Sequence, residues 1–260
     1  MNILKEIIEY KKLEVEERSK ITPIERIKDS QRLYSIRDFN GKLKNDGIQI
    51  IAEIKKRSPT SGNINSLADP PKIAKSYAAN GAACISVLTD YHYFGGQLEF
   101  IQNVKSVVDL PILRKDFIIS EYQVWESFHA GADAILLIAD SIEPSILQDL
   151  YFLASDLGLH VLIETHHGKH LEWINRLNPS MVGVNCRNLE TMKTDINWFE
   201  NIIIDLPEDS IWIAESGIQS DSDLEYVSRL GFHSALIGSI FMKSKDPGLA
   251  LAELCKNIIV

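Results

Sequence analysis

Ionisable and amide side chains stand at the ends of several apolar segments of this 260-residue sequence. The segment at 49–54, QIIAEI, carries Glu53 near its end, and Lys55 follows it at once. Side chains two residues apart in a strand lie on the same face, so we expect this carboxylate and this amine to lie together. Four more apolar segments end in the same way, with Lys115, Glu164, the pair Asn185 and Arg187, and Glu215.

Two lysines and an arginine opposite three carboxylates can supply acids, bases and contacts to an anion. Mutual proximity should move the pKa values of these groups apart. Small residues end two of the segments: Ser216 and Gly217 follow Glu215, and Gly238 and Ser239 close the last segment. Backbone N–H groups and hydroxyls at such positions are typical phosphate ligands. No Ser or Cys triad and no P-loop is recognisable.

These side chains need a fold that brings many strand ends together. We predict eight strands that alternate with helical patterns, and several of them are entered through a Gly, as in NGAACISV and AGADAILL. A Gly at this place is typical of a helix C-terminus before the next strand. Continuously apolar strands linked by helices are typical of a parallel sheet. The predicted strands are roughly 49–54, 83–89, 111–115, 133–138, 159–164, 181–186, 211–215 and 234–238.

Eight such units in about 215 residues match the size of a (β/α)8 TIM barrel. A doubly wound open sheet is the alternative, but no G-x-G-x-x-G opens a helix here. The stretch ILKEIIEYKKLEVEERS has apolar residues at helical spacing and lies outside the repeat. We therefore predict a single barrel domain over residues 1–260, in which residues 1–45 form an N-terminal helical extension over part of the barrel mouth. Because catalytic groups of this fold sit at the C-terminal ends of strands, the charged ends should surround one mouth.

Composition excludes several classes of function. The formal net charge of -9 argues against general nucleic-acid binding, which depends on a basic surface. No stretch approaches the roughly 20 apolar residues of a membrane span. The N-terminus lacks the pattern of a signal peptide, so we expect a cytoplasmic protein. Three widely separated cysteines argue against a disulfide framework or zinc ribbon. The sequence leaves the oligomeric state open, a monomer included.

Some side chains near the charged ends have a structural explanation. His166 and His170 have a metal-ligand spacing, but no Glu is placed as in H-E-x-x-H, and a solvated helix start explains both residues without a metal. Strand alternation points Cys186 outward into packing, which argues against a nucleophile. Tyr91 and Tyr93 are expected to pack their own loop.

Seven stretches of the sequence occur in the order of a known family. They are IAEIKKRSPTSG, SVLTDYHYFGGQLEF, LPILRKDFIISEYQVWE, AGADAILLI, VGVNCRNLET, IAESGI and ALIGSIFM. They resemble the indole-3-glycerol phosphate synthase family of tryptophan biosynthesis, and the resemblance covers essentially the whole chain. It implies a (β/α)8 barrel with an N-terminal extension. It also implies closure of the indole ring of 1-(2-carboxyphenylamino)-1-deoxyribulose 5-phosphate with loss of carbon dioxide and water, and no cofactor or metal.

The resemblance also implies roles for the charged residues. Lys115 would be the general acid that protonates the ribulose carbonyl. Lys55 would contact the anthranilate carboxylate and help proton transfer, and Glu164 would serve as acid and base during dehydration. Three residues would orient these groups and the sugar hydroxyls: Glu53, Asn185 and Glu215.

The remaining positions would bind the substrate. Phe117 would pack on its aromatic ring, while Ser58 and Arg187 would line the same mouth. Ser61 stands where many family members have Lys, which leaves that contact open. The phosphate would be held by Ser216, Gly217, Gly238 and Ser239.

Two alternatives stay open at this point. Another phosphate-binding barrel, such as a sugar-phosphate isomerase, would share the phosphate site but would not need Lys55 and Lys115 together. In a non-catalytic barrel that binds a phosphorylated ligand, the charged residues would be left over from an ancestral enzyme and have no catalytic role.

Overall fold

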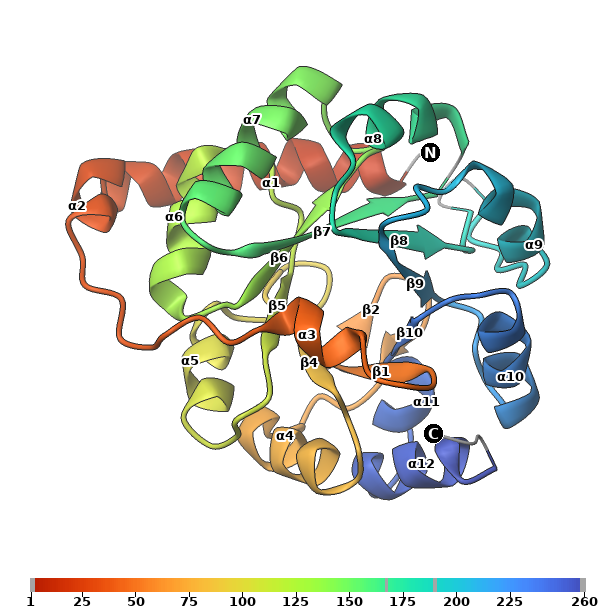
Figure 1. Ribbon diagram of the computed structural model, residues 1–260. Coiled ribbons are helices and arrows are strands. Elements are labelled where there is room, and N and C mark those ends of the chain that lie inside the picture. Colours follow the sequence, from red (N-terminus) through yellow and green to blue (C-terminus); the bar gives the residue numbers. More distant parts are fainter. Residues whose placement is uncertain (1–2, 167, 189–190, 258–260) are drawn as a thin grey trace.

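Eight parallel strands close into a barrel in the computed structural model, which describes residues 3–166, 168–188 and 191–257. The strand order is β1-β10-β9-β8-β7-β6-β5-β4, and β1 pairs with both β10 and β4. Helices surround these strands (Figure 1), which confirms the predicted (β/α)8 barrel. The strands are β1 (Gln49–Ile54), β4 (Cys84–Leu88), β5 (Ile112–Lys115), β6 (Ala134–Ile138), β7 (His160–Thr165), β8 (Met181–Asn185), β9 (Ile211–Glu215) and β10 (Ser234–Ile237). Each predicted strand overlaps one of them.

The crossovers carry the outer helices. The predicted Gly signal is seen at the end of α6, where Gly131 takes a left-handed φ of 93° that costs glycine no steric clash. In α10, a capping box between Ser220 and Asp223 satisfies the first backbone N–H groups. The helices are α4 (Pro70–Ala79), α5 (Glu99–Lys105), α6 (Glu121–Ala130), α7 (Pro144–Asp156), η1 (Gly168–His170), α8 (Leu171–Leu177), α9 (Trp198–Ile202), η2 (Ile203–Asp205), α10 (Asp221–Arg229), α11 (Ser239–Met242) and α12 (Pro247–Cys255).

Strand alternation divides the apolar side chains into two buried layers. Residues such as Ile50, Ile85 and Val182 point outward and pack against the helices. Residues such as Leu113 and Leu162 point inward and fill the barrel interior. The inward positions nearest the C-terminal strand ends are polar, so the interior changes there from a packed core to a site.

Different helices of the N-terminal extension pack at the two ends of the barrel. Its helices are α1 (Ile3–Ile21), α2 (Ile24–Lys28) and α3 (Phe39–Leu43). Helix α1 lies at the mouth, as predicted, because its residues Leu4 and Ile7 line the mouth cavity. Helix α3 does not cover the mouth: Phe39 and Leu43 are fully buried in the interior layer, beside the strand starts. Figure 1 shows α3 in front of the barrel strands.

The position of α3 corrects the expectation that all of residues 1–45 cover the mouth. The strands β4 and β6 begin with the small residues Cys84 and Ala134, which leave room in the interior. Two large apolar side chains of α3 fill that room, since an empty interior would forfeit packing energy. In the loop after β1, a short hairpin of β2 (Arg57–Ser58) and β3 (Gly62–Asn63) projects beside the mouth. No helix in the described ranges is long and apolar enough to cross a bilayer.

Candidate active site

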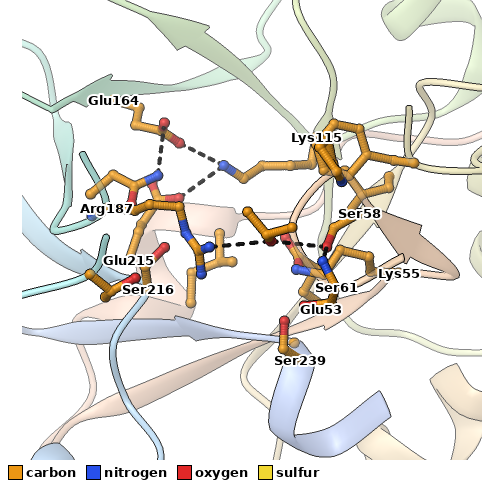
Figure 2. A pocket seen from close by; sticks show the side chains of 18 of the residues that line it. Glu53, Lys55, Ser58, Ser61, Lys115, Glu164, Arg187, Glu215, Ser216 and Ser239 are labelled. Carbon is orange, nitrogen blue, oxygen red and sulfur yellow. Dashed lines mark hydrogen bonds and ion pairs between the residues drawn. The ribbon is translucent and has the colours of Figure 1, made fainter. Parts of the chain in front are cut away.

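A cavity of about 440 Å³ opens at the C-terminal ends of the strands (Figure 2). Every site residue predicted from the sequence lines it, so the structure brings the whole set together at one mouth. Ser61 lines it as well. The predicted residues are Glu53, Lys55, Ser58, Lys115, Phe117, Glu164, Asn185, Arg187, Glu215, Ser216, Gly217, Gly238 and Ser239.

Lys115 lies between two buried carboxylates. Its Nζ is 2.6 Å from Glu164 Oε2 and 2.9 Å from Glu215 Oε2, and both glutamates are 2% exposed. Burial alone would lower the pKa of Lys115, but the charges of Glu164 and Glu215 outweigh it and raise this pKa above its usual range. Lys115 is therefore an ammonium at neutral pH; it lines the cavity and donates to both glutamates.

His166 was predicted to lie in a solvated helix start, and this prediction was wrong. The residue follows β7 directly and is only 4% exposed. Its Nδ1 lies 3.2 Å from Asp140 and its Nε2 lies 3.1 Å from Glu164. Burial opposes the charge of His166, but hydrogen bonds to Asp140 and then Glu164 raise its pKa to about 9. His170 also contacts Asp140, at 3.3 Å, while His167 lies outside the described residues.

The two carboxylates around Lys115 have different surroundings. Glu164 accepts from Lys115, from Asn185 Nδ2 at 3.2 Å and from His166. Burial would raise the pKa of Glu164, but Lys115 and then His166 outweigh it, and the pKa falls well below its usual range. Burial and the neighbouring Glu164 raise the pKa of Glu215 to about 8. Of these two carboxyl groups, Glu164 is thus ionised and Glu215 is protonated at neutral pH.

The side of the mouth at β1 carries a second set of polar groups. Lys55 Nζ donates to Glu53 on the same face of the strand end, as the two-residue spacing predicted. Ser58 Oγ accepts from the N–H of Ser61 at 3.1 Å. Arg187 reaches across from the end of β8 to Thr60 Oγ1 at 3.3 Å (Figure 2). The contact between Arg187 and Thr60 joins the hairpin loop to the end of β8.

Strands β9 and β10 are neighbours in the barrel. The residues predicted to bind phosphate follow their ends, and we call this group the phosphate corner: Ser216, Gly217, Gly238 and Ser239. Ser216 and Gly217 both take left-handed conformations, with φ of 68° and 81°. A Cβ at 217 would lie 2.8 Å from the sulfur of Cys186, and a Cβ at 238 would lie 2.5 Å from Glu53 Oε1. Glycine is therefore required at Gly217 and Gly238, because any side chain would displace a neighbour.

Cys186 itself packs in the outer apolar layer, as strand alternation predicted. Burial raises the pKa of its thiol to about 12, which keeps it protonated and unreactive.

Aromatic rings form one wall of the cavity. Phe117 packs over the interior layer, and its ring lies 6.0 Å from that of Phe94. Tyr93 packs edge-on against Tyr10 of α1, so this loop packs on the extension, but Tyr91 is 64% exposed and does not share in that packing. The wall is aromatic and apolar, a surface that suits a planar ring.

Comparison with known proteins agrees with this arrangement. A family model described as indole-3-glycerol phosphate synthase matches residues 4–254. The chain belongs to the indole-3-glycerol phosphate synthase family. A relative of that name from Thermoanaerobacter pseudethanolicus is 42% identical over 255 residues, which cover 98% of each chain.

Solved structures of other proteins share the fold of this family member. A 3-hexulose-6-phosphate synthase from Salmonella typhimurium superposes with a TM-score of 0.65 at 12% identity, over 80% of this chain and 97% of that one. A thiamine phosphate pyrophosphorylase from Pyrococcus furiosus gives a TM-score of 0.60 at 13% identity, over 84% of this chain and 96% of that one. At such identities the likeness is one of barrel architecture only.

Sequence reasoning missed some residues around the mouth of this indole-3-glycerol phosphate synthase family member. Lys243, after α11, lines the cavity together with Leu4 and Ile7 of the extension. His166 had a usable signal: it stands two residues after Glu164, the same spacing that links Glu53 to Lys55. Lys243 had none, because a lysine one residue beyond a short helix has no distinctive pattern.

Proposed function

We propose that the mouth cavity is the active site for the reaction of this family, and that the residues lining it carry its steps. Family membership gives the activity: conversion of 1-(2-carboxyphenylamino)-1-deoxyribulose 5-phosphate to indole-3-glycerol phosphate, carbon dioxide and water, in tryptophan biosynthesis. The observation that carries the site assignment is Lys115, a charged ammonium between Glu164 and Glu215 at the centre of the mouth.

Lys115 is the general acid of the ring closure in this proposal. As the ring carbon that bears the carboxylate attacks the ribulose carbonyl, Lys115 donates a proton to the carbonyl oxygen, which becomes a hydroxyl. Its charge stabilises the negative charge that develops on that oxygen. Loss of carbon dioxide then returns the bonding electrons to the ring.

Glu164 is the acid and base of the dehydration. It is ionised before the reaction, so it can accept a proton from the carbon next to the one that carries the new hydroxyl, and the same carboxyl group can return that proton to the hydroxyl, which leaves as water. His166, backed by Asp140, holds the Glu164 carboxylate in place. Three residues orient the reacting groups and the sugar hydroxyls: Glu53, Asn185 and Glu215.

The substrate spans the mouth from the phosphate corner to the aromatic wall. Lys55 contacts the anthranilate carboxylate, and Phe117 packs on the ring that carries it. Ser58 and Arg187 line the mouth between these ends. The phosphate is held by Ser216, Gly217, Gly238 and Ser239, where backbone N–H groups and hydroxyls meet.

A direct assay tests the proposal: the chain is supplied with the carboxyphenylamino ribulose phosphate, and indole fluorescence is followed. Lys115→Met keeps the length of the side chain and removes its proton, so kcat should fall by roughly 10²- to 10⁴-fold with a smaller change in KM. A near-normal kcat in this variant would refute the assignment of the site. Wild-type isomerisation of a sugar phosphate without indole formation would favour the isomerase alternative.

A further inference from the structure

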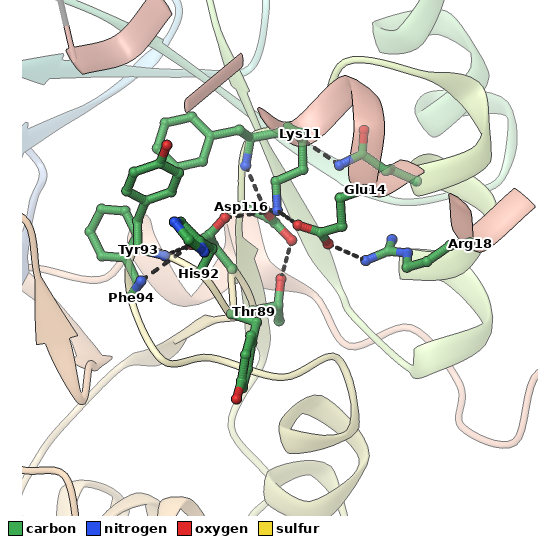
Figure 3. Close-up of polar contacts among 12 residues, drawn as sticks. Lys11, Glu14, Arg18, Thr89, His92, Tyr93, Phe94 and Asp116 are labelled. Carbon is green, nitrogen blue, oxygen red and sulfur yellow. Dashed lines mark hydrogen bonds and ion pairs between the residues drawn. The ribbon is translucent and has the colours of Figure 1, made fainter. Parts of the chain in front are cut away.

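Helix α1 carries a lysine that the reaction does not use and that is wholly buried. Lys11 is 0% exposed, although it lies in the extension outside the barrel. Its Nζ is 2.8 Å from Asp90, 3.1 Å from Asp116 and 2.9 Å from Glu14 (Figure 3). Burying an ammonium is costly unless it is paired, and here three carboxylates pair with it. Those charges outweigh burial and raise the pKa of Lys11 above its usual range.

The contacts of Lys11 continue into a closed circuit of alternating charges, which we call the charge ring. Asp116 pairs with Arg114 at 3.0 Å, and Arg114 lies 3.5 Å from Glu126 of α6. Glu126 pairs with Arg18 of α1, and Arg18 returns to Glu14 at 2.7 Å. The members of the charge ring are Lys11, Asp116, Arg114, Glu126, Arg18 and Glu14.

Two members of the charge ring are the sequence neighbours of the proposed general acid, Lys115. Arg114, within β5, and Asp116, just after its end, stand on either side of Lys115, and both side chains are almost completely buried. Strand alternation turns the side chain of Lys115 the other way, into the mouth. The N–H of Thr89 donates to the carbonyl of Lys115 at 3.2 Å, and the hydroxyl of Thr89 donates to Asp116 at 2.6 Å. The two hydrogen bonds of Thr89 thus fix the backbone around Lys115.

The two aspartates that pair with Lys11 also shape the aromatic wall. Asp90 accepts from the backbone N–H groups of Tyr93 and Phe94, at 2.7 and 3.2 Å. Asp116 accepts from the N–H of Phe117 at 2.8 Å. Without Lys11, two buried carboxylates would face each other behind the loops that present these rings, and like charges at close range repel.

We propose that Lys11 is a positioning residue for the reaction: through the charge ring, helix α1 fixes the end of β5 and so the place of Lys115 in the mouth. The extension then contributes to turnover by more than covering the site. This inference rests on the role proposed for Lys115. A displacement of about 1 Å at a reacting group can cost about 100-fold in rate, which is the effect that loss of the ring would produce.

The first test compares Lys11→Met with Lys12→Met in the full chain. Lys12 is the matched control, because it is 57% exposed and pairs only with Glu9 on the same helix among the described residues. Lys11→Met should lower kcat by about 10- to 100-fold with a smaller change in KM, since a misplaced Lys115 loses contact chiefly in the transition state. Lys12→Met should leave both constants unchanged. A folded Lys11→Met chain with wild-type kcat would overturn the proposal.

The second test separates positioning from a general loss of structure. If Lys11 acts through Lys115, then Lys11→Met should cause no further fall in the residual rate of a Lys115→Met chain. A further fall of the same size as in the wild-type background would show a merely structural role. If Lys11→Met does not fold, Asp116→Asn breaks the ring with an isosteric change; it should lower kcat, and wild-type kcat would overturn the proposal.

The same variants distinguish the two levels of the argument. A Lys115→Met chain that keeps its kcat contradicts the proposed function itself. A Lys115→Met chain that loses kcat beside a folded Lys11→Met chain that keeps it contradicts only the role of Lys11.

Discussion

The unequal surroundings of Glu164 and Glu215 lead to a prediction that two matched variants can test. Glutamine has the shape of a protonated carboxyl group and cannot take up a proton. Glu215 is protonated at neutral pH, with a pKa of about 8, so Glu215→Gln should leave its state nearly unchanged. Glu164 is ionised and accepts from Lys115, Asn185 and His166, so Glu164→Gln removes both a charge and the proposed base.

The expected magnitudes differ widely. General acid and base catalysis is worth roughly 10²- to 10⁴-fold, so Glu164→Gln should raise the barrier by about 3 to 5 kcal/mol. Glu215→Gln still offers an amide oxygen to Lys115, and its kcat should fall by less than about tenfold. Steady-state kcat at pH 7 from indole fluorescence measures both, with circular dichroism as a check that each variant is folded.

The pH profile gives an internal control for this assignment. As the pH rises through about 8, Glu215 loses its proton and adds a second negative charge beside Glu164. The change in wild-type kcat that accompanies this ionisation should be missing from Glu215→Gln. If Glu215→Gln instead lost as much kcat as Glu164→Gln, the two carboxyl groups would have the opposite states and the reasoning would be refuted.

Other variants test the substrate contacts, the fold and its pH dependence. Lys55→Met should raise KM as well as lower kcat, because it removes the proposed contact to the substrate carboxylate; an unchanged KM in steady-state assays would contradict that contact. Ser216→Asp combined with Ser239→Asp should raise KM strongly, since like charge would face the phosphate dianion, and no such rise would refute the phosphate corner. The pKa of His166 is about 9 in the folded chain against 6.5 in the unfolded chain. Its protonation therefore stabilises the fold by roughly 3 kcal/mol below pH 6.5, and this stabilisation is lost as the pH rises through 9. Urea unfolding at pH 6 and pH 10 should therefore show a large gap between wild type and His166→Gln that shrinks at the higher pH; a constant gap would count against the charged imidazole. Phe39→Ala should cost about 3 to 5 kcal/mol of unfolding free energy by opening the barrel interior, and a loss below 1 kcal/mol would show that α3 does not seal it.

The sequence by itself determined the barrel and placed most of the proposed active-site residues at one mouth. Eight apolar runs separated by helical patterns leave few other folds, and the strands were placed to within a few residues. The site followed because the fold delivers the C-terminal end of every strand to one mouth, so the order of residues along each strand is enough to place Glu53, Lys115 or Glu215. Periodicity is a local signal, and these residues obey it.

The tertiary structure alone decided how these groups are charged and what holds them. Lys11 lies on the buried face of α1 with Leu4, Ile7 and Ile8. No pattern in its own segment predicts its ion pairs with Asp90 and Asp116. The same holds for α3, whose apolar residues fit an interior space that only the closed barrel creates. A pKa depends on burial and on distances between residues far apart in the chain. Local spacing could therefore place the carboxylates of Glu164 and Glu215 at the mouth, but which of them keeps its proton depends on contacts that form only when the barrel closes.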